Sequence, residues 1–380
     1  MKKQHLLAPG PTPIPSEALL AMARPILYHR SPAYEALFAH VREGLKSLFR
    51  TEHEVLMFTA SGTGAMEAAV VNTLSPGDRA LVVVGGKFGE RWAELCQAYG
   101  VEVIPVEIEW GKALRPEQVT SALEQDPSIK AVFVTHSETS TGVLHDVRAL
   151  AEVVKEKEAL LIVDAITSLG VTEVETDAWG LDIVVAGSQK ALMIPPGLAF
   201  CAVSKKTWAA VGRSKLPRFY FDFQATKKSQ EKNQSPFTPA VSLVAALKEA
   251  LDLIQAEGLE KVIARHKRLS RATLAGVEAL GLEPFAERPS PAVTAVKAPE
   301  GIAPKEIVKA MRTKYGITIA GGQGKLKDTI FRIAHLGYAD ESDVILVLST
   351  LERILSELGY PAKLGEGVRA AQEIFLKSEG

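Results

Sequence analysis

Cysteine is scarce in this chain, which has only Cys96 and Cys201 among its 380 residues. Two cysteines cannot make a disulfide framework or a four-cysteine zinc site, and such low usage is natural for a reducing compartment. Cys96 falls in a helical pattern and Cys201 in a strand pattern, so we expect both to be small core residues. The sequence therefore predicts neither a disulfide framework nor a metal site.

Long apolar runs and net charge are missing too. Charged residues interrupt every apolar run well before the roughly 18 residues of a membrane span, and the first residues lack the apolar stretch of a signal peptide. The formal net charge is −1, so no overall positive field would recruit nucleic acid or an anionic membrane. We expect a cytoplasmic protein with small-molecule partners, without nucleic acid or membrane.

Seven short apolar runs alternate with amphipathic segments between residues 54 and 203. Strands that are apolar on both sides are typical of a parallel sheet covered by helices on both faces. The runs are Val55–Thr59, Ala80–Val84, Glu102–Val106, Ala131–Thr135, Leu160–Asp164, Ile183–Ala186 and Leu198–Val203. This predicts an α/β fold whose large domain holds a mainly parallel seven-stranded sheet, with ligands at the carboxyl ends of its strands.

The rest of the chain predicts an arm and a smaller domain. Prolines exclude a helix from Ala8–Pro15, where Gly10 lets the backbone approach a neighbour closely. Residues 204–238 show weak periodicity and are predicted to form a connecting, lid-like region, and two long helices follow. We expect an arm at 1–15, a large domain at 16–255 and a small C-terminal α/β domain at 256–380.

Three segments at the ends of predicted strands carry residues suited to chemistry. Thr59–Glu67 follows a strand and opens a helix, and its backbone N–H groups suit a phosphate, although an ordinary capped helix start is the alternative. Asp164 ends an apolar run and either partners a cation or caps a turn. Lys190 lies in an apolar setting that lowers the pKa of an amine and favours attack on carbonyl carbons, unless it extends to the surface.

These parts occur in the chain order of a phosphate-binding turn, an acid for a pyridinium nitrogen and a Schiff-base lysine, which pyridoxal-phosphate chemistry requires. The sequence resembles the class V aminotransferases of pyridoxal-phosphate fold type I, especially the alanine/serine–glyoxylate (serine–pyruvate) group. The resemblance covers nearly the whole chain. It rests on Ala8–Thr12, Ser61–Gly64, Thr135–Val143, Val163–Ala165, Gly187–Leu192, Pro195–Gly197 and Thr238–Leu243.

The resemblance implies a role for each matching residue. Lys190 would carry pyridoxal 5'-phosphate and shuttle the substrate's α-proton, and Asp164 would hold the pyridine nitrogen protonated. Thr238 would reach the phosphate from the neighbouring subunit, so the active unit would be a homodimer with shared active sites. The remaining cofactor contacts would be Ser61, Gly62, Thr63 and Gln189 at the phosphate, Phe88 and Ile166 on the two ring faces, and Thr139 at the ring hydroxyl.

Four further residues are expected at the substrate. Arg332 has a planar guanidinium that suits bidentate capture of the α-carboxylate, the role that the family gives this position, while a structural salt bridge is the alternative. His29 and Arg30 precede a proline-initiated helix and either bind a second anionic group or form a plain loop. Gly10 of the arm is expected to line the same site.

The predicted reaction is ping-pong transamination from alanine or serine to a 2-oxo acid, glyoxylate or pyruvate. Phosphoserine or aspartate with 2-oxoglutarate is the alternative, because His29 and Arg30 could accept a second anion. A β-lyase or desulfurase on the same fold would need a mobile cysteine nucleophile, and neither cysteine falls on a plausible active-site loop. A non-catalytic binding protein of this fold would not need the intact lysine, aspartate and arginine.

Overall fold

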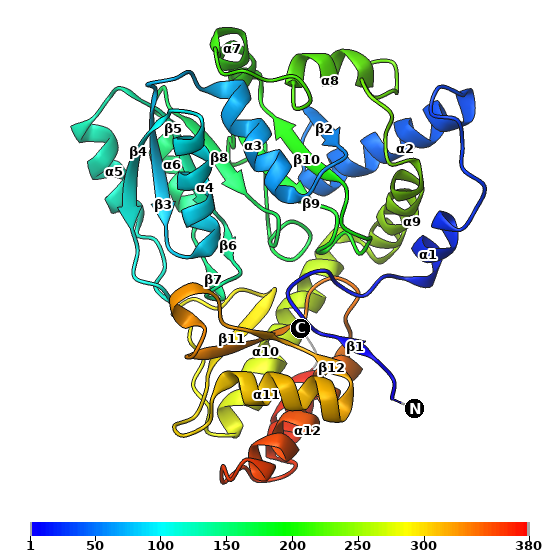
Figure 1. Ribbon diagram of the computed structural model, residues 1–380, viewed down its shortest axis with the longest axis vertical. Helices are drawn as coiled ribbons and strands as arrows, with labels where there is room; N and C mark the ends of the chain where they lie inside the picture. The colour runs from blue at the N-terminus through cyan, green and yellow to red at the C-terminus, as the bar shows by residue number, and fades with distance from the viewer. Residues whose placement is uncertain (1, 378–380) are drawn as a thin grey trace.

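The computed structural model describes residues 2–377. Met1 and residues 378–380, at the ends of the predicted arm and small domain, lie outside the described residues. Figure 1 shows a larger α/β lobe above a smaller one, with helix α10 (Leu259–Ala279) leading from the first to the second. Among the described helices, none is long and apolar enough to cross a membrane.

A seven-stranded sheet forms the centre of the larger lobe. One strand, β10, is antiparallel to both of its neighbours, and all other neighbouring strands are parallel. The mainly parallel sheet is therefore confirmed, and each predicted strand lies within two residues of the observed one. In spatial order the strands are β2 (Glu54–Phe58), β10 (Ala199–Val203), β9 (Ile183–Gly187), β8 (Leu160–Asp164), β5 (Ile129–Thr135), β3 (Arg79–Val84) and β4 (Glu102–Glu107).

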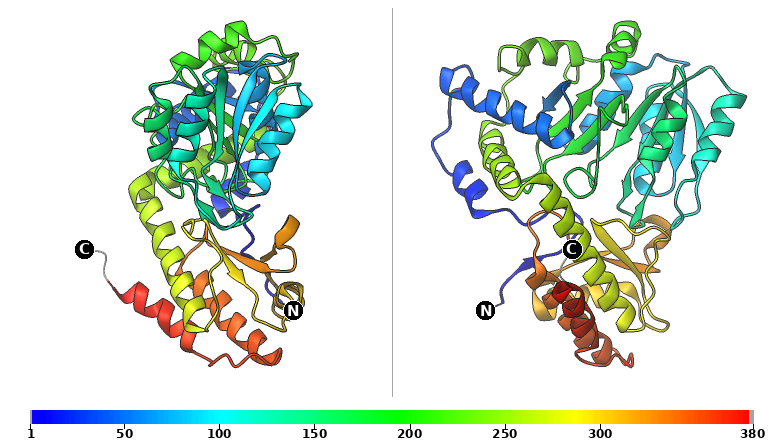
Figure 2. Two further views of the ribbon diagram at one scale, coloured as in Figure 1. Left: turned by 90° about the vertical axis from the view of Figure 1, so that its left-hand side faces the viewer. Right: turned by 180° about the vertical axis from the view of Figure 1, so that it is seen from behind.

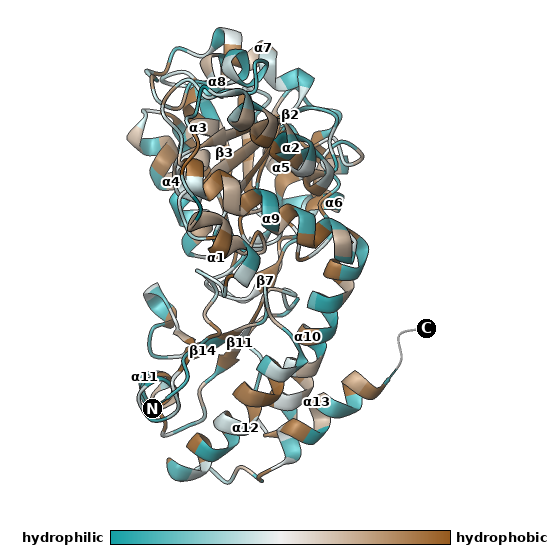
Figure 3. Cartoon of the chain, turned by 90° about the vertical axis from the view of Figure 1, so that its right-hand side faces the viewer, coloured by the Kyte–Doolittle hydropathy of each residue, from teal (hydrophilic) through white to brown (hydrophobic). Residues whose placement is uncertain are grey.

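Helices cover both faces of this sheet, because side chains alternate along each strand. In β8, Leu161 and Val163 pack in the core on one face, and Leu160 and Ile162 in the core on the other. The central strands accordingly appear hydrophobic in Figure 3. The first core includes side chains of α2 (Pro32–Phe49), α5 (Pro116–Gln125), α6 (Val147–Val154) and α9 (Val241–Glu257); the second includes those of α3 (Gly62–Thr73) and α4 (Lys87–Ala98).

Both cysteines lie in the second core. Cys96 on α4 and Cys201 on β10 are buried free thiols, as expected of small core residues. Burial raises the pKa of the Cys96 thiol to about 12, so the thiolate form is disfavoured.

Residues 204–238, predicted to form a connecting, lid-like region because of their weak periodicity, contain regular structure. Two helices occur there, α7 (Lys205–Arg213) and α8 (Phe223–Gln230). Each begins at a side-chain cap: the Ser204 hydroxyl accepts the backbone N–H of Thr207, and the Asp222 carboxylate accepts that of Ala225. Helices this short give too few turns for a clear periodic signal.

The smaller lobe packs helices against a three-stranded antiparallel sheet, as its predicted α/β pattern indicates. The helix that begins at Pro304 continues into a π-helical turn, Met311–Tyr315. A last helix follows Lys363. The elements are β11 (Val293–Lys297), β14 (Ile330–Ala334), β13 (Ala320–Gly321), α11 (Pro304–Ala310), α12 (Glu341–Glu357) and α13 (Glu366–Leu376).

The N-terminal arm links the two lobes, as the second view in Figure 2 shows. Strand β1 (His5–Leu6) pairs in parallel with β12 (Ile317–Thr318) of the smaller lobe. The arm then reaches the larger lobe, where the Thr12 backbone N–H donates to the Gln189 carbonyl at 3.2 Å. Helix α1 (Ser16–Met22) follows. The arm thus passes the carboxyl end of β9.

Candidate active site

Lys190 lies in the turn after β9, at the carboxyl edge of the sheet. Its amine donates a hydrogen bond to the Pro9 carbonyl of the arm. Gly10 has φ +140°, and a Cβ at this residue would overlap the Lys190 amine, so only glycine fits here. Burial lowers the pKa of the amine to about 8, although the charge of Asp164 raises it. Lys190 is therefore an enclosed amine rather than a surface lysine.

Asp164 ends the neighbouring strand β8 and is 3% exposed. Its Oδ1 accepts the backbone N–H of Ile166 at 2.8 Å, which is the turn-capping contact that the sequence left open. Burial raises the pKa of this carboxyl to about 7, while Arg91 and Lys190 lower it. No residue in the range 2–377 donates a hydrogen bond to its Oδ2. Capping therefore leaves one carboxylate oxygen open for a cationic group.

The start of helix α3 is the segment that the sequence predicts to bind an anion. Ser61 is the N-cap residue, but its hydroxyl makes no capping hydrogen bond. A Cβ on Gly62 would overlap the Ile166 side chain, which brings the helix start beside the turn after Asp164. The Gln189 amide oxygen is buried without a hydrogen-bond partner. The Ser61 hydroxyl and the Gln189 amide oxygen, neither used in a cap or a hydrogen bond, therefore lie between the ends of β2, β8 and β9. The backbone N–H groups at the helix start favour an anion there.

Phe88 and Thr139 lie beside these groups. Phe88 is in the first turn of α4, and the Arg91 guanidinium lies 4.9 Å from the centroid of its ring. Arg91 also donates to the Thr63 hydroxyl at 3.3 Å, so a cation faces the predicted phosphate turn. The hydroxyls of Thr139 and Thr167 are hydrogen bonded at 2.8 Å.

Arg332 enters the site from β14 of the smaller lobe and is 4% exposed. Its guanidinium donates to the Gly321 carbonyl from Nε at 3.0 Å and from Nη2 at 2.7 Å, and to the Thr139 carbonyl from Nη1 at 2.8 Å. Burial lowers its pKa to about 10, whereas the charge of Glu138 raises it. Within residues 2–377 no carboxylate forms an ion pair with it, so the alternative of a structural salt bridge was wrong. Carbonyl groups hold the side chain while its charge stays available to an anion.

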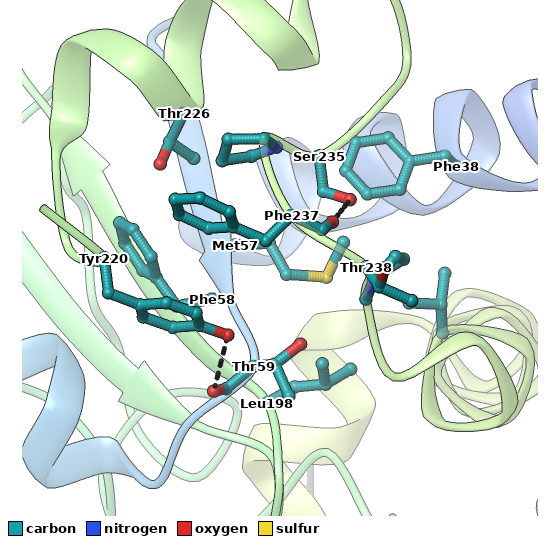
Figure 4. Close-up of a pocket in the computed structure, with 13 residues that line it drawn as sticks. Phe38, Met57, Phe58, Thr59, Leu198, Tyr220, Thr226, Ser235, Phe237 and Thr238 are labelled. Carbon is teal, nitrogen blue, oxygen red and sulfur yellow. Dashed lines mark hydrogen bonds between the residues drawn. The ribbon is translucent and has the colours of Figure 1, made fainter. Parts of the chain in front are cut away.

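Three predicted residues lie outside this cluster within one subunit. Arg30 donates to the Gln234 side chain at 2.5 Å, and the His29 ring packs edge-on against Tyr28. Thr238 is exposed at a small, mainly apolar pocket, where Figure 4 shows it beside Phe237. No contact joins these residues to the lysine, aspartate and arginine of the site in the described chain.

Two residues of the site were missed by the sequence-based predictions, Arg91 and Glu138. Arg91 looked like one charge on an amphipathic helix, and nothing in its spacing separates it from a solvated face. Glu138 lies in the segment Thr135–Val143, which carries part of the family resemblance, but the resemblance implied no role for it. The available signal was an acidic residue three positions after a buried strand, a place where a carboxylate requires partners.

The family follows from the match along the chain. Residues 16–334 match the family model described as Aminotransferase class-V. This chain belongs to the class V aminotransferases. Membership implies pyridoxal 5'-phosphate as cofactor and amino and oxo acids as substrates.

Relatives of this aminotransferase match over nearly the full length. It is 48% identical to the "Soluble hydrogenase, small subunit" of Synechococcus sp., covering 98% of each chain. It is 39% identical to the L-aspartate–glyoxylate aminotransferase of Paracoccus denitrificans (98% of this chain, 96% of the other), and 39% identical to the serine–glyoxylate aminotransferase of Hyphomicrobium methylovorum (98% and 95%). A structure of a Thermus thermophilus aspartate aminotransferase of subgroup IV is 40% identical, with a TM-score of 0.87 over 93% of this chain and 100% of that one.

The residues present fit the implied cofactor. The open Oδ2 of Asp164 suits a pyridinium N–H, which would also offset the cost of burying this charge. The free Ser61 hydroxyl, the start of α3 and the Gln189 amide suit a phosphate, and the enclosed Lys190 amine suits a carbonyl carbon. The described part of the chain contains no group of three or more His, Cys, Asp or Glu that could hold a metal ion.

Proposed function

We propose that this aminotransferase moves the amino group of a small amino acid, alanine or serine, to glyoxylate or pyruvate in a ping-pong reaction. The observation that carries the proposal is the buried Arg332 guanidinium, which carbonyl groups hold and which forms no ion pair with a carboxylate of residues 2–377. Such a group suits an α-carboxylate. Arg30, which was predicted as a second cation for a side-chain anion, is instead bound to Gln234 within the described subunit. The serine–glyoxylate relative supports the same choice.

Each step of the transfer has a residue suited to it. Arg332 would bind the α-carboxylate through its planar fork and orient the α-carbon toward Lys190. The pKa of Lys190, about 8, lies near working pH. Its Nζ would accept the proton from the α-carbon and then donate it to a different carbon, which is the 1,3-proton transfer that transamination requires. The Oδ2 atom of Asp164 would accept a hydrogen bond from the protonated pyridine nitrogen throughout the reaction. Pyridoxal 5'-phosphate, when bound, supplies the electron sink that makes the α-proton acidic.

The remaining cofactor contacts are proposed from the same geometry. Ser61, Gly62, Thr63 and Gln189 would hold the phosphate, with Arg91 supporting Thr63. Phe88 and Ile166 would cover the two faces of the ring, and Thr139 would contact its hydroxyl. Gly10 would line the substrate site, because its backbone borders the Lys190 amine.

We also propose a homodimer with shared active sites. Large apolar side chains are exposed on the larger lobe. Among them, Ile26 has 75% of its surface exposed, Tyr28 67% and Phe219 80%. They lie on connected segments: Arg30 binds Gln234, and Phe219 and Phe237 pack with ring centroids 5.5 Å apart. An apolar surface of this kind favours burial against a second copy. Thr238, next to Phe237, would then face the neighbouring subunit.

Aspartate or phosphoserine as amino donor is the second candidate. Two aspartate aminotransferases are among the similar proteins, one of which uses glyoxylate. This candidate needs a second cation at the substrate, and His29 and Arg30 could supply it only across the dimer interface.

The proposal is tested with Lys190→Ala and a substrate panel. The wild-type enzyme should show a visible cofactor band that serine or alanine bleaches and glyoxylate or pyruvate restores. Lys190→Ala should lose this band and at least a thousandfold in kcat, whereas Lys205→Ala, at the surface start of α7, should keep both. An unchanged spectrum and turnover in Lys190→Ala would overturn the mechanism. A higher kcat/KM for aspartate with 2-oxoglutarate would establish the second candidate instead.

A further inference from the structure

Glu138 is a buried carboxylate that the proposed steps do not use. It lies on β6 (Ser137–Glu138), is 1% exposed, and is surrounded by hydrogen-bond donors. Its Oε2 accepts the backbone N–H groups of Phe88 at 3.1 Å and Gly89 at 3.0 Å. Its Oε1 accepts the backbone N–H of Ser140 at 3.2 Å and the Ser140 hydroxyl at 2.5 Å.

These contacts replace a missing helix cap. Helix α4 has Gly86 at its N-cap, which has no side chain to bind the free N–H groups of the first turn. The Ser140 hydroxyl accepts the Lys87 N–H at 3.0 Å, and Glu138 accepts the next two. A Cβ on Gly86 would overlap the Glu138 carboxyl group and the Ser140 hydroxyl. The glycine therefore makes room for a cap that comes from a distant segment.

The donors around Glu138 favour its ionised form. Burial raises the pKa of this carboxyl above its ordinary value, and each of the four hydrogen bonds opposes that rise. All four hydrogen-bonding groups donate to Glu138. A protonated carboxyl would place its own O–H donor opposite one of these donors, and that hydrogen bond would be lost. The positive end of the α4 dipole favours a carboxylate further.

The same segment also meets Arg332. Thr139, the next residue, offers its carbonyl to the Arg332 guanidinium at 2.8 Å. The charge of Glu138 raises the pKa of Arg332, which means that it stabilises the guanidinium cation. Since no carboxylate forms an ion pair with Arg332 in residues 2–377, Glu138 is the negative charge that offsets it.

We propose that Glu138 is a positioning residue for amino transfer: it caps α4 and thereby fixes Phe88 over the cofactor ring, and its charge moderates the attraction of Arg332 for carboxylates. This proposal rests on the proposed function of the site. A moderated Arg332 would release an oxo-acid product that differs from the substrate only in its amino group. The two parts of the proposal predict different measurable effects.

The first measurement is the circular dichroism of the visible cofactor band, which depends on a fixed ring orientation. Glu138→Gln keeps the side-chain size but turns an NH2 group toward one pair of donors, so the band ellipticity should fall by at least half. Ser140→Ala removes one part of the cap and should lower it less. Glu90→Gln is the matched control, because Glu90 is in the first turn of the same helix but pairs with Lys87 at the surface. It should leave the ellipticity unchanged.

The second measurement is the dissociation constant of propionate, a carboxylate without an amino group, followed through the visible band. Loss of the Glu138 charge should tighten propionate binding by at least a few-fold, because the bound carboxylate no longer experiences a like charge near Arg332. Ser140→Ala keeps the charge and should bind propionate as the wild type does, and so should Glu90→Gln. If Glu138→Gln only made the site less ordered, propionate would instead bind more weakly than to the wild type.

Wild-type ellipticity in Glu138→Gln, or in Ser140→Ala if the first variant does not fold, would overturn the capping role. Unchanged or weaker propionate binding in folded Glu138→Gln would overturn the charge role. Both measurements require a bound cofactor but no turnover, so a failure of amino transfer would not be mistaken for either result. If no cofactor bound, amide hydrogen exchange of residues 86–90 would still test the cap, with at least tenfold faster exchange expected in Glu138→Gln.

Discussion

At the scale of single residues, burial shifts the charges of the site toward their neutral forms. It raises the pKa of Asp164 to about 7 and lowers that of Lys190 to about 8. Both values lie near neutral pH, where small changes in surroundings alter protonation. Perturbed values of this kind cluster at functional sites because acid–base chemistry requires them. Without the cofactor, the same burial makes Asp164 costly to ionise.

Asp164 makes one contribution to the pH dependence of stability that a single substitution can isolate. Its folded pKa of about 7 exceeds the unfolded value of 3.8, so the folded chain binds more protons between these values. The contribution of Asp164 to the stability of the cofactor-free chain should therefore fall as pH rises through this window, by on the order of a few kcal/mol at most. Asp164→Asn removes the charge and should raise Tm at pH 8 but hardly at pH 4.5. Equal Tm differences at both pH values, measured by calorimetry, would contradict this account.

At the scale of elements, the N-terminal arm contributes more than its proline-rich sequence indicates. Its strand β1 belongs to the smaller lobe, and Leu7 accepts the backbone N–H of Ala334, two residues after Arg332. Its other end holds the turn of the site lysine through Thr12, whose hydroxyl donates to the Lys190 carbonyl at 2.9 Å. The arm therefore connects the residues proposed to bind the substrate carboxylate and the cofactor.

The arm can be tested at Thr12. Thr12→Val has nearly the same shape but lacks the hydroxyl, so the chain should lose about 1 kcal/mol of stability. The freed arm should also slow cofactor loading several-fold, because the Pro9 carbonyl no longer holds the Lys190 amine. Thr12→Ser keeps the hydroxyl and should behave like the wild type. Thermal melts and the rate at which the visible band appears measure the two effects; identical rates for the valine and serine variants would exclude a role of the arm in loading.

At the scale of the whole molecule, the site within one subunit lacks three of its predicted contributors. His29, Arg30 and Thr238 lie away from Lys190, on or beside segments with exposed apolar side chains. A second copy placed on this surface would bury those side chains and bring a new set of polar groups to the site. The dimer is therefore part of the proposed function rather than an independent property.

Charge placed on this surface should separate the subunits. Ile26→Asp combined with Phe219→Asp should shift sedimentation to the monomer and weaken cofactor binding at least tenfold, since Thr238 would no longer reach a neighbouring site. Leu376→Asp is the control, because this side chain is 83% exposed on α13 of the smaller lobe. Dimers in the double variant, or monomers with full cofactor affinity, would contradict the shared site.

The sequence by itself determined the sheet and the residues at its edge. Strand burial on both faces requires continuous apolar runs, so the runs before Asp164 and Lys190 could be located directly. Chain order then placed both residues at the same edge, because parallel strands end on one side. Short capped helices such as α7 and α8 could not be located in the same way, because their few turns give no clear helical periodicity in the sequence.

Only the tertiary structure decided which polar groups meet. Arg332 lies 168 positions after Asp164 along the numbered chain, and whether it would find a carboxylate or carbonyl groups depended on how the lobes pack. The same holds for the cap that Glu138 gives to α4 and for the arm beside Lys190. Hydrogen bonds between distant segments depend on positions set by the packed core, whereas the apolar pattern of one strand reflects only the burial of that strand.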